Sequence, residues 1–165
     1  MYYRLLAGQF LPETIKRVLY LDPDILIINP LRPLWEMDME GKPFAAAAHT
    51  GKTELANHVN RIRLRGDHDY FNSGVLLIDL ALTRKIIQPK GLFSYIETHR
   101  KELLLPDQDI LNALYGKDIL PINDALWNYD ARKYNNYLFR SSGEQDMLWV
   151  MQHTAILHFC GTAKP

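Results

Sequence analysis

Apolar residues along the chain fall into short runs separated by polar, proline and glycine positions. The runs at 17–21, 44–48 and 74–80 are mostly apolar and short, which is typical of buried strands. Between them, apolar residues recur three or four positions apart and predict helices. Helices are predicted at 2–10, 34–37, 83–87, 92–103 and 106–115, and further short strands at 25–28, 118–121 and 155–159.

Two segments show no clear period. Residues 51–69 are interpreted as a loop with some helix, and residues 127–142 as an aromatic, polar loop. The chain contains no internal repeat and no low-complexity linker. Strands that alternate with helices therefore predict a single α/β domain over residues 1–165.

The composition excludes several classes of protein. The 19 basic and 19 acidic residues balance, and no basic stripe for nucleic-acid binding is present. The single cysteine, Cys160, excludes an internal disulfide, and the apolar runs are too short to span a bilayer. The first residues do not read as a signal peptide. We therefore expect a cytoplasmic protein, with peripheral attachment at the inner face of the membrane left open for the full-length protein.

An acidic triplet, Asp22-Pro23-Asp24, stands between two apolar runs. If the segment is extended, its two carboxylates point to the same side and suit a divalent cation. The alternative is a solvated turn, because the chain has two other Asp-x-Asp triplets and Asp-Pro is a common turn signal. The flanking apolar runs favour the metal site, since an unpaired charge is costly to bury.

A histidine near the end of the chain is a second candidate ligand. In the run 155–159, Ala155, Leu157 and Phe159 share one face and His158 lies on the other. A core histidine satisfied by a hydrogen bond is the alternative. Gly161 and Lys164 follow, and together they suit a diphosphate that bridges the metal and the lysine. An imidazole ligand favours manganese over calcium.

Five segments of the chain together form a pattern. They are YYRL at 2–5, RVLYLDPD at 17–24, YFNSGVLL at 70–77, LPDQDILN at 105–112 and HFCGTAKP at 158–165. In this order and spacing they resemble glycosyltransferase family 8, which includes bacterial lipopolysaccharide galactosyl- and glucosyltransferases and glycogenin.

The resemblance implies an α/β, GT-A-type nucleotide-diphospho-sugar transferase fold. It also implies a UDP-sugar donor, UDP-glucose or UDP-galactose, with retention of the anomeric configuration and a manganese or magnesium cofactor. By the same resemblance, Asp22, Asp24 and His158 are the metal ligands, and Asp107 and Gln108 face the reacting sugar carbon as the catalytic pair. The donor-binding residues it implies are Arg4, Asp22, Asp24, Asn72, Asp107, Gln108, Gly161 and Lys164.

Several of these residues have structural alternatives. Asp107 follows a proline at a helix start and is also a good N-cap. The segment 72–74 is also a turn signal before a strand. Trp127 and Asn128 are candidates for the acceptor side, with packing of the aromatic ring as the alternative.

The chain departs from the family pattern at its front end. Relatives carry an earlier segment with the first strands of the sheet and the nucleoside contacts, so we expect a partial GT-A fold, the C-terminal portion of the catalytic domain. A sheet that lacks strands leaves an unpaired edge, which favours self-association. His49 stands where some members have an acidic residue near the donor sugar.

The predicted function is metal-dependent transfer of a hexose from a UDP-sugar to a glycan, lipid-linked or protein acceptor, as in lipopolysaccharide biosynthesis. Attack from the same face of the sugar is preferred to double displacement, because the amide of Gln108 is a poor nucleophile. The alternatives are an inactive remnant that binds nucleotide-sugar and metal, a metal-dependent diphosphate hydrolase, and a structural domain without a ligand.

Overall fold

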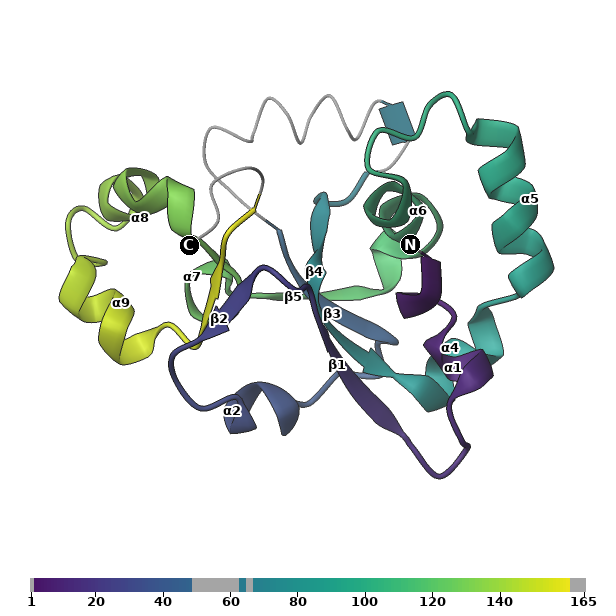
Figure 1. Cartoon of the computed structure of the whole chain (residues 1–165), viewed down its shortest axis with the longest axis horizontal. Coiled ribbons are helices and arrows are strands. Elements are labelled where there is room, and N and C mark those ends of the chain that lie inside the picture. Colours follow the sequence, from purple (N-terminus) through teal and green to yellow (C-terminus); the bar gives the residue numbers. More distant parts are fainter. Residues whose placement is uncertain (1, 49–62, 65–66, 161–165) are drawn as a thin grey trace.

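Two sheets organise the protein (Figure 1). The computed structural model describes residues 2–48, 63–64 and 67–160. The larger sheet has the strand order β1-β4-β3-β5, in which β3 and β5 are parallel and the other neighbours antiparallel. The smaller sheet has the order β2-β7-β6. The strands are β1 (Arg17–Leu21), β2 (Ile25–Ile27), β3 (Phe44–Ala48), β4 (Phe71–Asp79), β5 (Ile119–Ile122), β6 (Tyr129–Asp130) and β7 (Ile156–His158).

Strand β4 is the centre of the core. Its side chains alternate: Leu76 and Ile78 belong to one buried cluster, whereas Val75 and Leu77 belong to another on the opposite face. This period of two on a strand buried on both faces explains its unbroken aliphatic run. The sequence-based prediction of a buried strand is confirmed, although β4 begins at Phe71, earlier than predicted.

The early start of β4 has a specific cause. Asn112 of α6 accepts a hydrogen bond from the Phe71 backbone N–H (2.7 Å) and donates one to the Phe71 carbonyl (2.8 Å). Phe71 also pairs with Ala48 of β3, beyond a shift in register. The asparagine side chain therefore adds to the strand pairing at this residue. Such a long-range contact leaves no periodic trace in the sequence.

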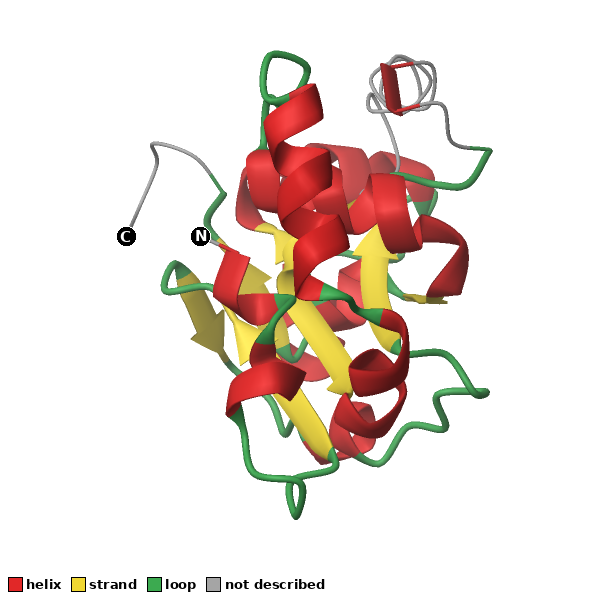
Figure 2. Ribbon diagram, turned by 90° about the vertical axis from the view of Figure 1, so that its right-hand side faces the viewer, coloured by secondary structure: helices red, strands yellow, loops and turns green. Residues whose placement is uncertain are grey.

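Helices cover the two faces of the larger sheet (Figures 1 and 2). Leu80, Leu92 and Ile110, from three successive helices, pack in the Leu76 cluster, and Leu34 packs with Ile156 in the cluster on the opposite face. Helical elements before residue 119 include η1 (Tyr2–Arg4), α1 (Ala7–Phe10), α2 (Arg32–Trp35), α4 (Leu80–Ile86), α5 (Pro89–His99), α6 (Pro106–Tyr115) and η2 (Gly116–Asp118). The α/β fold class is therefore confirmed. In the described part of the chain, no helix is long and apolar enough to cross a membrane.

Some predicted boundaries were wrong. The helix predicted at 2–10 is divided into η1 and α1, and α2 begins at Arg32 rather than at residue 34. Most of the predicted loop at 51–69 lies outside the described residues.

The largest error is the loop predicted at 127–142. This region contains β6, η3 (Ala131–Lys133) and α8 (Tyr134–Arg140), and is flanked by α7 (Asp124–Trp127) and α9 (Met147–His153). Tyr129 and Tyr137 stack at a centroid distance of 4.0 Å within a small third core cluster. These aromatic residues, interpreted as loop residues, are what hold the helices together.

Asp109 ties three segments to α6. Its buried carboxylate pairs with Arg63 (2.6 Å) and accepts hydrogen bonds from the Tyr70 hydroxyl (2.6 Å) and from the backbone N–H groups of Leu104 and Leu105. Burial alone would raise the pKa of this carboxyl. The arginine, the tyrosine and the two backbone donors together outweigh burial, so the pKa is lowered.

We expect Asp109→Asn to lower the free energy of unfolding by on the order of 3 kcal/mol at neutral pH, because the buried ion pair loses its anion. Because folding lowers the pKa of Asp109, its carboxylate stabilises the folded state fully at any pH above the unfolded-state pKa of about 4. This stabilisation is lost as the pH falls through the lower pKa of the folded state. The difference between wild type and variant should therefore be constant from about pH 6 upward and shrink below pH 4. Urea unfolding at several pH values measures it.

The exposed carboxylate Asp118, just beyond α6, provides the control. Asp118→Asn should change stability by less than about 0.5 kcal/mol. An Asp109→Asn variant that follows the wild-type pH profile would show that the buried carboxylate is not the group that titrates.

Candidate functional site

The acidic triplet forms a turn where the chain passes from one sheet to the other. Asp22 follows β1 and Asp24 precedes β2. The Asp22 backbone N–H donates to the Gly74 carbonyl in β4 (2.8 Å), and the Phe159 N–H, just after β7, donates to the Asp24 carbonyl (2.9 Å). The segment is therefore not the continuous extended strand that the sequence argument assumed, and the carboxylates converge because both sheets hold the turn.

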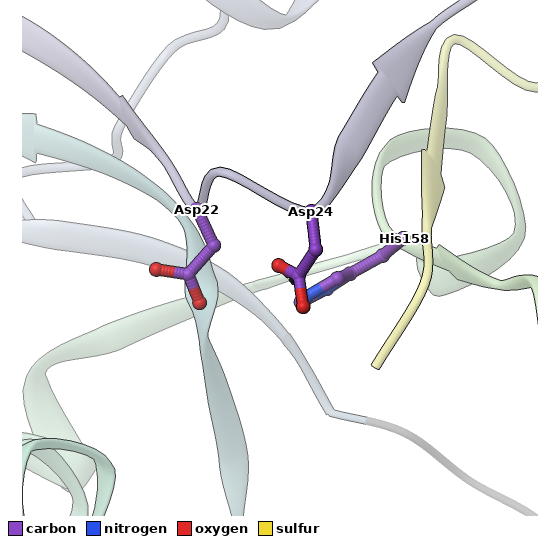
Figure 3. Close-up of side chains that lie close together, drawn as sticks. All are labelled: Asp22, Asp24 and His158. Atoms are coloured by element: carbon purple, nitrogen blue, oxygen red, sulfur yellow. Dashed lines mark ion pairs between the residues drawn. The ribbon is translucent and has the colours of Figure 1, made fainter. Parts of the chain in front are cut away.

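His158 completes a cluster with the two aspartates (Figure 3). Each of Asp22, Asp24 and His158 offers one ligand atom, and these three atoms lie within 4.8 Å of one another. His158 Nε2 is 3.4 Å from Asp24 Oδ1. The sequence-predicted ligands thus come together from residues far apart in the chain.

The residues fit a divalent cation. Two partly exposed carboxylates and one buried imidazole are a mixed oxygen and nitrogen set of the kind that manganese accepts. Burial lowers the pKa of His158, although Asp24 and Asp22 act in the opposite direction. The imidazole is therefore neutral at pH 7, as a metal ligand must be.

Gly74 allows β4 to pass close to this cluster. A Cβ added at Gly74 would collide with the His158 ring, and would lie 2.7 Å from Asp22 Oδ2 and 3.0 Å from Asn72 Oδ1. The glycine is needed here for close approach of the backbone and not for an unusual φ angle.

Arg4 connects the acidic turn to α6. Its Nη2 lies 3.0 Å from Asp22 Oδ1 and 2.8 Å from Asp107 Oδ2, and its Nη1 donates to the Ser73 carbonyl (2.6 Å). The guanidinium also lies over the Tyr20 ring, 4.2 Å from its centroid. The Tyr20 hydroxyl donates to Asp22 Oδ1 at 2.8 Å. Arg4 therefore pairs both with Asp22, a candidate metal ligand, and with Asp107, the predicted catalytic carboxylate.

The structural alternative for Asp107, a helix N-cap, does not hold. Leu105 is the N-cap residue of α6, without a side-chain cap hydrogen bond, and Asp107 lies in the first turn. Its carboxylate is paired with Arg4 instead. An acidic side chain in the first turn still interacts favourably with the positive end of the helix.

Gln108 is fixed by the start of β4. Its Oε1 accepts hydrogen bonds from Asn72 Nδ2 (3.1 Å) and from the Ser73 backbone N–H (3.2 Å). One turn further along α6, Asn112 binds the Phe71 backbone. Gln108 thus helps to dock α6 on β4, and its amide oxygen has a defined position near the site.

The sequence interpretation missed part of the site. Tyr20, Ser73 and Gly74 lie within segments that carried the family resemblance but were given no role. Asn128 was placed toward the acceptor, yet its buried side chain lies between Asn72 and His158. Trp127 packs against a core cluster, in keeping with the packing alternative. Two predicted donor-binding residues, Gly161 and Lys164, lie outside the described residues, as does His49, the departure from the family pattern.

Comparison with known proteins identifies related sequences. Residues 1–165 match the family described as Glycosyl transferase family 8. The chain is 30% identical to general stress protein A of Bacillus subtilis, over 99% of the chain and 58% of that protein. It is 28% identical to lipopolysaccharide 1,2-glucosyltransferase of Escherichia coli, over 100% of the chain and 48% of that protein. The chain thus spans about half the length of these relatives.

Solved structures show the same fold. The galactosyltransferase LgtC, solved in complex with donor and acceptor sugar analogues, aligns with a TM-score of 0.77 and 30% identity, over 99% of this chain and 59% of that chain. The glycosyltransferase GlyE of Streptococcus pneumoniae aligns with a TM-score of 0.70 at 24% identity, over 100% of this chain and 38% of that chain. The fold is therefore that of the GT-A glycosyltransferases.

We expect Gly74→Ala to disable the cluster, because the added methyl group must displace the His158 ring or the Asp22 carboxylate. The affinity for Mn²⁺ in isothermal titration calorimetry should fall at least tenfold, as expected when ligands lose their orientation. Gly91 of α5 provides a matched control, since the nearest atom to its added Cβ is Gln88 Cβ at 4.0 Å. Gly91→Ala should bind Mn²⁺ like the wild type, and equal affinities of all three proteins would contradict the close-approach argument.

Proposed function

Because the chain belongs to glycosyl transferase family 8, we propose that it carries the donor-diphosphate and sugar-reacting part of a metal-dependent, retaining hexosyltransferase. The observation that supports this most is the convergence of Asp22, Asp24 and His158 beside the group formed by Arg4 and Asp107. A donor with a diphosphate next to a sugar needs such an arrangement, with cation ligands at one end and polar sugar contacts at the other.

The metal ligands define the diphosphate end of the proposed site. A manganese or magnesium ion held by Asp22, Asp24 and His158 would supply electrostatic stabilisation of the charge that develops on the departing UDP. Arg4 adds a fixed positive charge beside Asp22. The Arg4 side chain is only 10% exposed, and the low dielectric there strengthens its interactions. Gly161 and Lys164 are proposed as further diphosphate contacts from the sequence alone.

Asp107, Gln108 and Asn72 define the sugar end. The Asp107 carboxylate is paired with Arg4, which makes it a weaker nucleophile than a free carboxylate. The Gln108 amide is neutral and held by Asn72 and Ser73. Both features favour same-face attack by the acceptor, with Asp107 and Gln108 positioning the sugar and stabilising its developing positive charge.

The acceptor is proposed to be a sugar hydroxyl. This follows the E. coli relative, whose name is lipopolysaccharide 1,2-glucosyltransferase, and LgtC, whose structure contains an acceptor sugar analogue. The donor is proposed to be UDP-glucose or UDP-galactose, because these two proteins are named as a glucosyltransferase and a galactosyltransferase, and the family resemblance implies a UDP-sugar.

The first test is UDP binding by calorimetry, with and without Mn²⁺. We expect Mn²⁺ to increase UDP affinity, and the Asp22→Asn/Asp24→Asn double variant to lose this increase, because neutral amides are weak ligands for a divalent cation. The exposed pair Asp67 and Asp69 forms another Asp-x-Asp triplet and provides the matched control, Asp67→Asn/Asp69→Asn. UDP affinity that is independent of Mn²⁺ in a folded wild type would contradict the proposal.

The second test concerns the stereochemical course. With a UDP-α-hexose donor and a sugar acceptor, the product should carry an α linkage, as read from proton NMR coupling constants. Mass spectrometry of the protein with a slow-reacting donor should find no sugar attached to Asp107 or Gln108. A covalent adduct would replace same-face attack by double displacement. Release of UMP and hexose 1-phosphate regardless of acceptor, the products of water attack on the diphosphate, would favour the diphosphate hydrolase.

A further inference from the structure

We propose that Asn128 is a positioning residue that sets the tautomer of His158 and links the metal ligands to Gln108. Asn128 follows α7, and its side chain is fully buried between β4 and β7. Its Nδ2 donates to Asn72 Oδ1 at 2.9 Å, and its Oδ1 lies 2.8 Å from His158 Nδ1. Since Asn72 also donates to Gln108, four side chains form one continuous chain of hydrogen bonds.

Backbone groups determine which side chain donates and which accepts in each of these hydrogen bonds. The Gly74 N–H donates to Asn72 Oδ1 at 2.9 Å, and the Ser73 N–H donates to Gln108 Oε1 at 3.2 Å. A backbone N–H can only donate, so both of these side-chain oxygens must be acceptors. Asn72 must therefore turn its Nδ2 toward Gln108 and its Oδ1 toward Asn128.

The same reasoning determines which nitrogen of His158 carries the proton. With its Nδ2 donating to Asn72, Asn128 presents its Oδ1 to the imidazole. An amide oxygen is only an acceptor, so His158 Nδ1 must carry the proton. In the neutral ring, Nε2 is then unprotonated, and this is the atom on the Asp24 side.

Burial makes the arrangement obligatory. His158 is 3% exposed and Asn128 is 0% exposed, so solvent cannot replace a lost partner of either side chain. A buried polar group without a partner is costly, which favours the pattern that satisfies both Asn128 and His158 Nδ1. Nε2 and Asp24 Oδ1, 3.4 Å apart, are then both acceptors, and a cation between them would satisfy both. The lone pair of Nε2 is thus presented to the cluster before a cation arrives.

The metal role of this lone pair rests on the proposed function, whereas the tautomer does not. Through Asn128, a change at the metal ligand His158 also reaches Asn72 and Gln108 at the sugar end. Asn128 itself is not expected to touch the donor, and it acts through its two neighbours.

The tautomer is read directly by nitrogen-15 NMR of the histidine rings in the metal-free protein, with the His158 signals assigned from a His158→Gln sample. We expect a protonated Nδ1 and an unprotonated Nε2 in the wild type. A wild-type His158 protonated at Nε2 would overturn the proposal, and this reading requires no Asn128 variant to fold.

Two substitutions separate the roles of Asn128. Asn128→Leu removes the acceptor, and we expect loss of the fixed tautomer and a roughly 10- to 100-fold fall in Mn²⁺ affinity. Asn128→Asp keeps an acceptor for Nδ1–H, and should retain both the tautomer and Mn²⁺ affinity at or above that of the wild type. If a folded Asn128→Leu kept the tautomer and the affinity, or if Asn128→Asp lost the tautomer, the proposal would fail.

Asn123 provides the matched control at the other end of α7. Its side chain caps the helix by accepting from the Ala125 N–H at 2.9 Å. Asn123→Ala should lower the melting temperature without changing the His158 tautomer or Mn²⁺ affinity. A wild type with the expected tautomer but no Mn²⁺ affinity would count against the proposed metal site and not against the placement of the proton.

Discussion

The position of the acidic turn is set by hydrogen bonds from both sheets. The bond from the Asp22 N–H to Gly74 fastens one side of the turn to β4, and the bond from the Phe159 N–H to Asp24 fastens the other side to the end of β7. The separation of the two carboxylates is thus defined by how the sheets lie against each other. Every other contact of the site, including the salt bridges of Arg4, is built on this frame.

The arrangement also explains the residue types around the turn. Where β4 passes the turn, only hydrogen fits as a side chain, which accounts for Gly74. The Tyr20 hydroxyl donates to Asp22, and burial together with this bond raises the Tyr20 pKa, so the phenol remains a donor. Asp22 Oδ1 thereby accepts from Tyr20 and pairs with Arg4, whereas Oδ2 takes part in neither of these two contacts.

The sequence predicted the elements whose signal is local. The aliphatic run of β4 was sufficient to predict a buried strand. The apolar residues on both sides of the acidic triplet were sufficient to predict strands, but β1 is only half-buried and β2 is largely exposed. The ligand pair at the end of β1 stays a prediction. The triplet was predicted for a partly wrong reason, since it is a turn held by two sheets and not an extended segment. His158 was placed correctly on the face opposite Leu157, because alternation along a strand depends only on the backbone.

The remainder depends on contacts between distant residues. Asn128 lies 30 positions from His158, and Arg4 lies 69 positions from Ser73, so no spacing rule connects them. Helix α9 was missed because Met147, Leu148 and Met151 are 58%, 64% and 55% exposed, and its apolar residues form no single stripe. The capping residue Asp146, which accepts from the Trp149 N–H, was the signal that could have identified this helix.

The pairing of β2 with β7 has a consequence for the order of folding. Ile25 lies opposite His158 in that antiparallel pair, so this contact closes a loop of nearly the whole described chain. Long loops are costly to close before other contacts have formed, and such pairings form late. Asp22 and Asp24 are therefore synthesised long before His158, with which they form the cluster. The core around β4 can assemble first, and the cluster is completed only when β7 pairs with β2.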